Sequence, residues 1–364
     1  MRTRAVILSQ VNEPLTINDV EIGEPQFGEV LVQMVASGVC HTDVSVIHGI
    51  LPLPLPAILG HEGAGIVQVV GPGVTKLSAG DHVVVAAVPH CGQCRSCLQG
   101  KPFVCQNVLA LAFGGAMPDG TKRFRRDTEP LSHFFCQSSF AEYTLVPERI
   151  AVRVPKDIPL EKLGPLGCGV ATGAGAILNT AHVQPGQSVA VFGCGGVGLS
   201  AVMAARLAKA FPIIAVDVVE SRLALARELG ATETMHAGQT SVVEEIQKLT
   251  HGGVDYAFEC IGKAATIRQS VDGTRVGGTA VITGAVAAGS EVKLDGLGLL
   301  LKNIRANPQG SSIPDLFIPL LIDLWRRGEF PFDRLFSRTY SVNEINQAIA
   351  HMESGEVIKP IIQY

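Results

Sequence analysis

Residues 188–217, SVAVFGCGGVGLSAVMAARLAKAFPIIAVD, decide the fold class. An apolar run of strand length, Ser188 to Phe192, leads into a glycine turn, and a helical pattern from Gly196 to Lys209 follows. A second apolar run, Pro212 to Asp217, ends on an acidic residue. Strand, glycine loop, helix and strand in this order are typical of a β-α-β unit, whose two strands are parallel. The stretch therefore predicts a doubly wound parallel sheet and an α/β fold.

The sequence on either side of this stretch indicates a second domain. The patterns Glu220 to Leu229, Val254 to Glu259 and Ala280 to Gly284 extend the parallel sheet. Before about residue 155, short β-branched runs separated by Gly and Pro predict a compact β-rich domain; they are Glu29 to Val35, Gly65 to Val70 and His82 to Val88. After two helical patterns, Ile313 to Arg327 and Val342 to Glu353, a strand-like tail from Val357 to Gln363 is expected to rejoin the first domain.

The amino-acid composition limits which kinds of binding partner and which cellular compartment we expect for the chain. Lys plus Arg is 29 and Asp plus Glu is 33, so neither sign dominates, and we expect neither nucleic acid nor a membrane surface as a partner. The chain lacks an apolar run of about 18 residues and a signal-peptide pattern. Nine cysteines, four of them crowded together, favour metal ligation in a reducing cytoplasm. The basic stretch Lys122 to Arg126 is flanked by acidic residues and indicates a solvated loop.

Four cysteines follow one another closely in an otherwise polar segment: Cys91, Cys94, Cys97 and Cys105. Four thiolates at this spacing can close a tetrahedron around Zn²⁺. Such a site has no position left for substrate. The spacing therefore predicts a structural zinc site, and the alternative of buried free thiols is disfavoured by the polar surroundings.

A second set of candidate ligands is dispersed along the chain: Cys40, His61 and Cys168. Two thiolates and one imidazole leave a fourth position for water or an alcohol, as a catalytic zinc requires. Distance in sequence says nothing about proximity in the fold. From the residues alone, a hydrogen-bonded structural role for His61 therefore stays open.

The glycine turn of the opening stretch carries a phosphate-binding pattern, Gly193-Cys194-Gly195-Gly196-Val197-Gly198. The glycines allow a tight turn and a close approach of a pyrophosphate to the helix N-terminus. Asp217 follows at the end of the next strand, where an acidic residue accepts the ribose hydroxyls. Because a 2′-phosphate would be repelled there, the pattern favours NAD over NADP.

Taken together, these segments resemble the zinc-containing medium-chain alcohol dehydrogenases along essentially the whole chain. The resemblance is carried by Gly38 to Asp43, Gly60 to Gly65, the four-cysteine loop, Gly167 to Gly173, the glycine turn and Ser354-Gly355-Glu356, in the family's order. It implies a GroES-like β-rich catalytic domain, residues 1–165 with 312–364. It also implies a Rossmann-type NAD-binding domain, residues 166–311.

The resemblance also implies roles for individual residues. Cys40, His61 and Cys168 would bind the catalytic zinc, giving two zinc ions per subunit, with Asp43 hydrogen-bonded to His61 and Glu62 beside the metal. Zinc would acidify the bound alcohol, the Thr42 hydroxyl would take its proton, and a hydride would pass to the nicotinamide. The implied cofactor contacts are His41, Thr172, Arg222 and Lys359, besides the glycine turn and Asp217.

Within the family, the runs Leu163 to Cys168 and Thr172 to Ala176 look most like the aryl (benzyl) alcohol dehydrogenases and their allylic terpenoid relatives. The implied activity is reversible oxidation of a primary aryl or allylic alcohol to the aldehyde. The implied pocket is largely apolar and suits a flat unsaturated alcohol. Its residues would be Thr42, Leu51, Ala87, Phe134, Phe135 and Ala285.

Three positions depart from the family pattern or raise a separate question. Ser45 stands where the well-studied animal enzymes carry a histidine that finishes the proton relay, so water or His48 would have to replace it. Lys359 stands where the family has an arginine and would bind phosphate as a point charge. Cys194 lies at a helix N-terminus, where a lowered thiol pKa would make it sensitive to oxidation.

Two other functions are weighed against this activity. A dehydrogenase for S-(hydroxymethyl) thiol adducts of formaldehyde would need a cationic anchor, which Leu109 to Leu111 does not offer but Lys122 to Arg126 could. A zinc-stabilised, non-catalytic NAD-binding regulator would have no need for an open zinc site. The segment Leu109 to Gln137 resembles an insertion of dimeric family members, so we expect a homodimer or homotetramer.

Overall fold

The computed structural model describes residues 1–287 and 289–364, which pack into two compact units. The first unit holds residues 1–168, 313–321 and 336–364, and the second holds residues 169–312 and 322–335. These units differ from the expected domains mainly in residues 322–335, which pack with the second unit. Residues 166–168 pack with the first unit and residue 312 with the second, so both boundaries also move slightly. Where the domains end therefore stays a prediction.

The first unit contains two mainly antiparallel sheets. The smaller sheet has the strand order β4-β1-β2-β7-β8, and the larger has the order β10-β6-β5-β3-β18-β17, with β9 also paired to β3. The larger sheet confirms that the tail rejoins this unit, since β18 runs antiparallel to β3 with Ile362 opposite Ser37. The strands of the smaller sheet are β1 (Arg2–Leu8), β2 (Thr16–Ile22), β4 (Ala57–Ile58), β7 (Phe124–Arg126) and β8 (Glu129–Leu131). Those of the larger sheet are β3 (Glu29–Gly38), β5 (Gly63–Val70), β6 (His82–Val85), β9 (Tyr143–Pro147), β10 (Ala151–Val154), β17 (Thr339–Ser341) and β18 (Ile361–Gln363).

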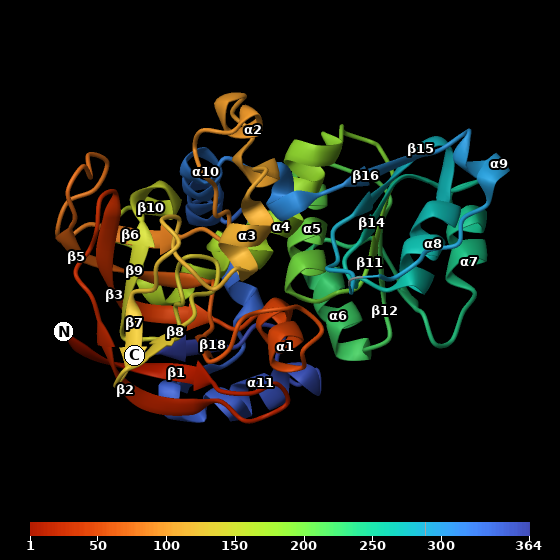
Figure 1. Cartoon of the computed structure of the whole chain (residues 1–364). Helices are drawn as coiled ribbons and strands as arrows, with labels where there is room; N and C mark the ends of the chain where they lie inside the picture. The colour runs from red at the N-terminus through yellow and green to blue at the C-terminus, as the bar shows by residue number, and fades with distance from the viewer. Residues whose placement is uncertain (288) are drawn as a thin grey trace. The chain divides into compact units, whose positions relative to one another are not determined.

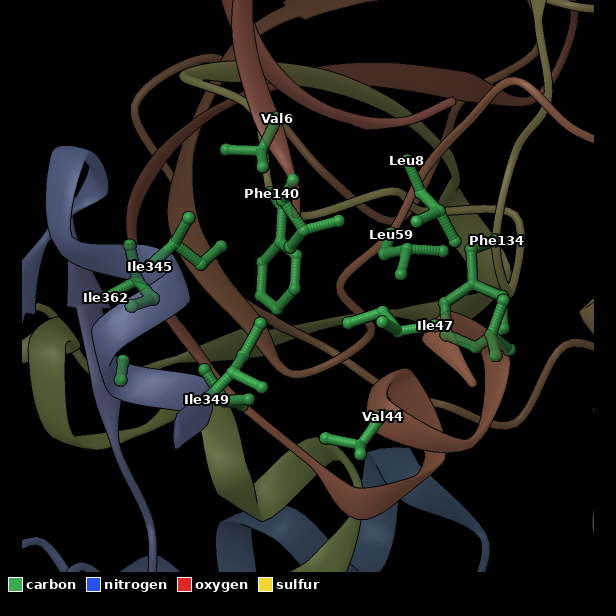
Figure 2. Close-up of a cluster of buried hydrophobic side chains, with 14 of the residues drawn as sticks. Val6, Leu8, Val44, Ile47, Leu59, Phe134, Phe140, Ile345, Ile349 and Ile362 are labelled. Atoms are coloured by element: carbon green, nitrogen blue, oxygen red, sulfur yellow. The ribbon is translucent and has the colours of Figure 1, made fainter. Parts of the chain in front are cut away.

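Short helices attach to these sheets through an apolar core. Figure 2 shows side chains from α1, α11, β1 and β18 converging on Phe140, which is fully buried. Val44 and Ile47, three residues apart on α1, both face this cluster, so the helix that follows Cys40 is anchored by apolar packing. The helices of this unit are α1 (His41–Ile47), α2 (Arg95–Leu98), α3 (Val108–Phe113) and α11 (Ile345–Glu353), while α10 (Pro314–Arg326) contributes residues to both units.

The second unit is the doubly wound parallel sheet expected from the sequence. Its strand order is β13-β12-β11-β14-β15-β16, and every neighbouring pair is parallel. Figure 1 shows α5 and α6 on one side of this sheet and α7 and α8 on the other. The strands are β11 (Val189–Phe192), β12 (Ile213–Asp217), β13 (Glu233–His236), β14 (Val254–Glu259), β15 (Thr274–Ile282) and β16 (Asn303–Ala306). The helices are α4 (Gly169–Gly175), α5 (Gly196–Leu207), α6 (Glu220–Leu229), α7 (Val242–Leu249), α8 (Ala264–Asp272) and α9 (Gly296–Leu299).

One expectation about the first unit is wrong. The basic stretch from Lys122 to Arg126 is not a solvated loop, because residues 124–126 form β7 and Arg123 is buried. The Arg123 guanidinium lies 2.7 Å from Glu29 Oε1 and also pairs with Asp119. The acidic partner Glu29 comes from the start of β3, far away in sequence, so local charge patterning did not indicate it.

Within the described residues, no helix is long and apolar enough to cross a membrane. All nine cysteines are free of disulfide bonds.

Candidate metal centres and dinucleotide turn

The dispersed candidate ligands come together in the first unit. Cys40 follows β3, His61 lies between β4 and β5, and Cys168 follows the short 3-10 helix Gly164–Gly167. Their ligand atoms, together with a carboxylate oxygen of Glu62, all lie within 4.8 Å of one another. The backbone helps to hold Cys168 there, because the Ala87 N–H donates to the carbonyl of Gly167.

His61 is oriented as a metal-binding imidazole. Its ring is fully buried, and Nδ1 lies 3.1 Å from Asp43 Oδ1. Nε2 is also buried but has no hydrogen-bond partner within the described structure. An N–H at Nδ1 that donates to a carboxylate leaves the lone pair on Nε2 for a metal. This orphaned nitrogen beside two thiols fits Zn²⁺, which prefers nitrogen and sulfur ligands.

Asp43 connects the two segments that supply Cys40 and His61. Its Oδ2 accepts the Cys40 backbone N–H at 3.0 Å, which also caps the N-terminus of α1. Its Oδ1 accepts from the Gly60 backbone N–H and from the His61 ring. One buried carboxylate therefore fixes both ligand-bearing segments.

Glu62 and Lys359 form a buried ion pair beside these ligands. The Lys359 ammonium lies 2.8 and 2.9 Å from the two Glu62 oxygens and donates to the Val39 carbonyl at 3.1 Å. An ammonium has three N–H donors, so these contacts use all of them. Burial raises the pKa of Glu62 to about 7, although the Lys359 charge opposes the shift. The expected contact of Lys359 with a pyrophosphate stays a prediction, and it requires one of these bonds to be exchanged.

The residues expected to handle a proton lie on α1. Thr42 Oγ1 is 3.7 Å from Cys40 Sγ, which puts the hydroxyl next to the candidate metal position. The Ser45 hydroxyl donates to the His41 carbonyl at 2.9 Å. The exposed His48 ring contacts Asn12 at 3.2 Å and Glu353 at 2.7 Å. The Ser45 and His48 side chains therefore hydrogen-bond to partners other than the Thr42 hydroxyl.

Aromatic rings surround His61. Phe135 stacks on the imidazole with a centroid distance of 4.8 Å, and Phe134 meets its edge at 5.3 Å. Phe113, at the end of α3, contacts Phe134 at 5.8 Å and Phe135 at 5.4 Å. The loop that presents these rings has left-handed backbone at Phe135, Cys136 and Ser138, a strained conformation that functional sites often retain.

The sequence did not indicate two residues of this neighbourhood. Gln137 is fully buried and holds the segment that leads from His61 into β5, since its Nε2 donates to the His61 carbonyl and its Oε1 accepts from the Gly63 N–H. Phe113 gave no signal either, because a phenylalanine ending an apolar helix is typical of a core. Only the fold brings these side chains to the site.

The four-cysteine loop has the geometry of a closed zinc site. Its ligand sulfurs lie within 4.8 Å of one another, with neighbouring pairs at 3.5, 3.6 and 3.9 Å. A Zn–S bond of about 2.3 Å gives a tetrahedron with edges of about 3.8 Å. Backbone N–H groups of Cys91, Cys94 and Asn107 donate to the sulfurs, as they do to bound thiolates. The residues therefore fit a structural Zn²⁺.

The glycine turn in the second unit fits a dinucleotide. Gly193 has φ +94°, and a Cβ on Gly198 would lie 1.7 Å from the Gly193 carbonyl, so the turn requires both glycines. A Cβ on Gly195 would meet nothing within 4 Å, which leaves open space where a pyrophosphate approaches the helix. Gly196 and Val197 begin α5.

Asp217 ends β12 beside this turn. Its carboxylate accepts from the backbone N–H groups of Cys194 at 2.6 Å, Val218 at 2.8 Å and Val219 at 2.9 Å. A carboxylate has about four acceptor positions, so one remains for a ribose hydroxyl. Arg222, in the first turn of α6, has a buried Nε without a hydrogen-bond partner in the described structure. Thr172 lies on α4, and its carbonyl accepts from Asn307.

The hypothesis of a low thiol pKa at Cys194 is wrong. The side chain is fully buried, and burial together with the nearby Asp217 carboxylate raises the pKa of the thiol well above its ordinary value. Burial also limits access of an oxidant. The position at a helix N-terminus does not offset these two effects.

Comparisons with known proteins agree with this geometry. Residues 26–156 match a family model described as an alcohol dehydrogenase GroES-like domain, and residues 196–320 match one described as a zinc-binding dehydrogenase. A geraniol dehydrogenase of Castellaniella defragrans is 42% identical over an alignment of 367 positions, which covers 99% of this chain and 97% of that protein. An S-(hydroxymethyl)glutathione dehydrogenase of Paracoccus denitrificans is 38% identical over the full length of both. The crystal structure of benzyl alcohol dehydrogenase from Acinetobacter calcoaceticus superposes with a TM-score of 0.96 at 42% identity, covering 100% of this chain and 99% of that one.

Proposed function

The chain belongs to the zinc-binding alcohol dehydrogenases with a GroES-like domain, which bind zinc and NAD(P), and from this premise we propose that it reversibly oxidises primary aryl or allylic alcohols to aldehydes with NAD⁺. The observation that carries the proposal is the aromatic wall around His61, made of Phe113, Phe134 and Phe135. Aromatic rings favour the planar π-systems of benzylic and allylic alcohols over saturated chains. Leu51, Leu53 and Leu55, half-buried against the same core, add apolar surface.

The proposed mechanism assigns each residue one task. Cys40, His61 and Cys168 hold the catalytic zinc, and Asp43 orients His61 and the Cys40 backbone. When bound, zinc supplies Lewis acidity toward an alcohol hydroxyl. The Thr42 hydroxyl would accept the proton of that alcohol, and the buried rings would exclude water. NAD⁺, when bound, would supply the hydride acceptor.

In this proposal the proton leaves Thr42 for water. The Ser45 hydroxyl is committed to the His41 carbonyl, and the His48 ring to Asn12 and Glu353. A proton route through either side chain would first require these contacts to break.

We propose that the other ligand sets have supporting roles. Cys91, Cys94, Cys97 and Cys105 hold a structural zinc. Gly193, Gly195 and Gly198 cradle the pyrophosphate. The Asp217 carboxylate accepts a hydrogen bond from a ribose hydroxyl, and its negative charge repels the 2′-phosphate of NADP. Arg222, Thr172 and His41, an exposed residue at the start of α1, are the remaining candidates for contact with NAD.

The thiol-adduct alternative has less support, although relatives with that activity are similarly close. The cationic anchor for the adduct's carboxylate would have to come from the basic stretch, and three of its four basic side chains are engaged elsewhere. Lys122 donates to Ser132, Arg123 pairs with Glu29, and Arg126 pairs with Glu129.

The test is NADH formation at 340 nm with benzyl alcohol and geraniol, compared with cyclohexylmethanol, ethanol and S-(hydroxymethyl)glutathione. We expect kcat/KM for benzyl alcohol to exceed that for cyclohexylmethanol by about tenfold or more, and Phe113→Leu to reduce this ratio several-fold. Phe27→Leu, a change at an exposed ring, serves as the matched control. Preference for the glutathione adduct would replace the proposal with the alternative. Absence of turnover with every alcohol would favour a non-catalytic NAD-binding regulator.

A further inference from the structure

Glu259 is a buried carboxylate at the carboxyl end of β14 that no step of the mechanism uses. Its side chain is fully buried. Oε1 accepts from the Ile261 N–H at 2.9 Å, the Gly262 N–H at 2.8 Å and the Thr266 hydroxyl at 2.7 Å, and Oε2 accepts from Gly262 at 3.1 Å. Among the described residues, no basic side chain forms an ion pair with it. The carboxylate is thus solvated entirely by the loop that follows its own strand and by the start of α8.

This arrangement interlocks two loops. Gly262 has φ +83°, and a Cβ there would lie 2.2 Å from the Ala285 carbonyl. A Cβ on Gly284 would lie 2.1 Å from the Gly262 nitrogen and 2.7 Å from Glu259 Oε2. The backbones after β14 and β15 therefore pack directly on each other, with the Glu259 carboxylate beneath them. Such a contact transmits any movement of one loop to the other.

The first loop also packs on the phosphate turn. A Cβ on Gly193 would lie 2.5 Å from the Ile261 side chain, so Ile261 covers the turn that follows β11. β11 and β14 are neighbours in the sheet (Figure 1). In their register, Phe192 lies opposite Glu259. Both loops therefore leave the same edge of the sheet.

Strand order decides which part of the cofactor these loops face. The acidic residue after the second strand of such a sheet holds the adenosine ribose, and the turn after the first strand holds the pyrophosphate. Here these strands are β12 and β11. The order reverses between β11 and β14, so the nicotinamide half extends toward the loops after β14 and β15.

We propose that Glu259 is a positioning residue, which fixes the backbone of residues 260–262 and 283–285 to bind the nicotinamide riboside half of NAD. The carboxylate acts through the loops and does not touch the cofactor. The inference requires dinucleotide binding, but it does not depend on which alcohol is the substrate.

The test compares the binding of the whole cofactor with that of its adenosine half. NADH is titrated by fluorescence and AMP by calorimetry, with the zinc-loaded full chain. Glu259→Met removes all four acceptor contacts, and we expect the Kd for NADH to rise about tenfold or more while the Kd for AMP stays within about twofold. Glu259→Gln keeps an oxygen for the three shorter contacts, so it should restore the Kd for NADH to within about threefold of the wild type.

A matched pair on α8 keeps the test valid if Glu259→Met does not fold. Thr266→Val removes the hydroxyl that donates to Glu259, whereas Ser270→Ala removes a buried hydroxyl that donates to the Ile267 carbonyl. We expect Thr266→Val to raise the Kd for NADH about threefold and Ser270→Ala to leave it unchanged. Equal rises for NADH and AMP, or an unchanged Kd for NADH in Glu259→Met and Thr266→Val, would overturn the proposal. A wild-type chain that binds AMP or benzyl alcohol but not NADH would overturn it as well, together with the cofactor assignment.

Discussion

At the scale of single residues, Asp43 is expected to affect metal binding through the His61 ring that it orients. Partners that orient a metal-bound histidine typically change metal affinity by about 10- to 100-fold when replaced. We therefore expect Asp43→Asn to weaken zinc binding at the open site by about that factor, measured by chelator competition. Asp19→Asn, at an exposed position on β2, is the control, and unchanged zinc affinity in Asp43→Asn would contradict the assigned role.

His133 makes a separate prediction about acid stability. Burial lowers the pKa of this histidine from 6.5 to about 3, and its Nε2 accepts the Arg123 backbone N–H. The unfolded chain binds a proton below about pH 6.5 while the folded chain does not, so the free energy of unfolding falls as the pH drops from there toward 3.

Replacing His133 should therefore flatten this pH dependence. His133→Gln keeps an acceptor for Arg123 but does not titrate, and it should remove roughly 4 kcal/mol of the loss in stability between pH 6.5 and 3. Denaturant unfolding over this pH range measures the effect. His251→Asn, at an exposed position, should leave the slope unchanged; equal slopes for wild type and His133→Gln would refute the prediction.

At the scale of elements, the four-cysteine loop is expected to bind its metal independently of the open site. Cys97→Ser should reduce the zinc content from two ions per chain to one and lower the Tm by about 5 °C or more, because a structural zinc contributes folding energy. Elemental analysis and thermal unfolding measure both effects. Ser96→Ala on the same helix is the control, and retention of two ions in Cys97→Ser would count against the assignment.

How far the sequence predicted an element depended on how local its determinants are. The four-cysteine loop and the glycine turn were predictable because their groups lie within a few residues of one another. The open site was not, because Cys40, His61 and Cys168 come together only through the tertiary fold; family resemblance supplied that connection. The Glu62–Lys359 pair and the Arg123–Glu29 pair join residues far apart in sequence, and no local pattern indicated them.

At the scale of the whole molecule, β16 is an exposed edge suited to a second copy of the chain. All four of its residues are exposed, and in the described structure it pairs only with β15. Exposed apolar side chains lie on it and just before it, namely Leu297, Leu300, Leu301 and Ile304. An edge strand of this kind pairs readily with its own copy, which would hide both the backbone groups and the leucines.

We therefore predict a homodimer formed through β16. Sedimentation equilibrium should give twice the chain mass of 38.3 kDa, or a multiple of that dimer, for the wild type. Leu300→Glu with Ile304→Lys should shift the mass toward the monomer, whereas Leu109→Glu, at an exposed leucine in the first unit, should not. A monomeric wild type at micromolar concentration would refute this prediction.

The two candidate zinc centres also differ in how early during translation their ligands are all present. The ligands of the four-cysteine loop emerge within one short stretch, so this loop can capture its ion while most of the chain is still unsynthesised. The open site requires Cys168 and the folding of the strands that flank Cys40 and His61. We therefore expect a stage during synthesis at which the four-cysteine loop is able to hold an ion while the open site is still incomplete.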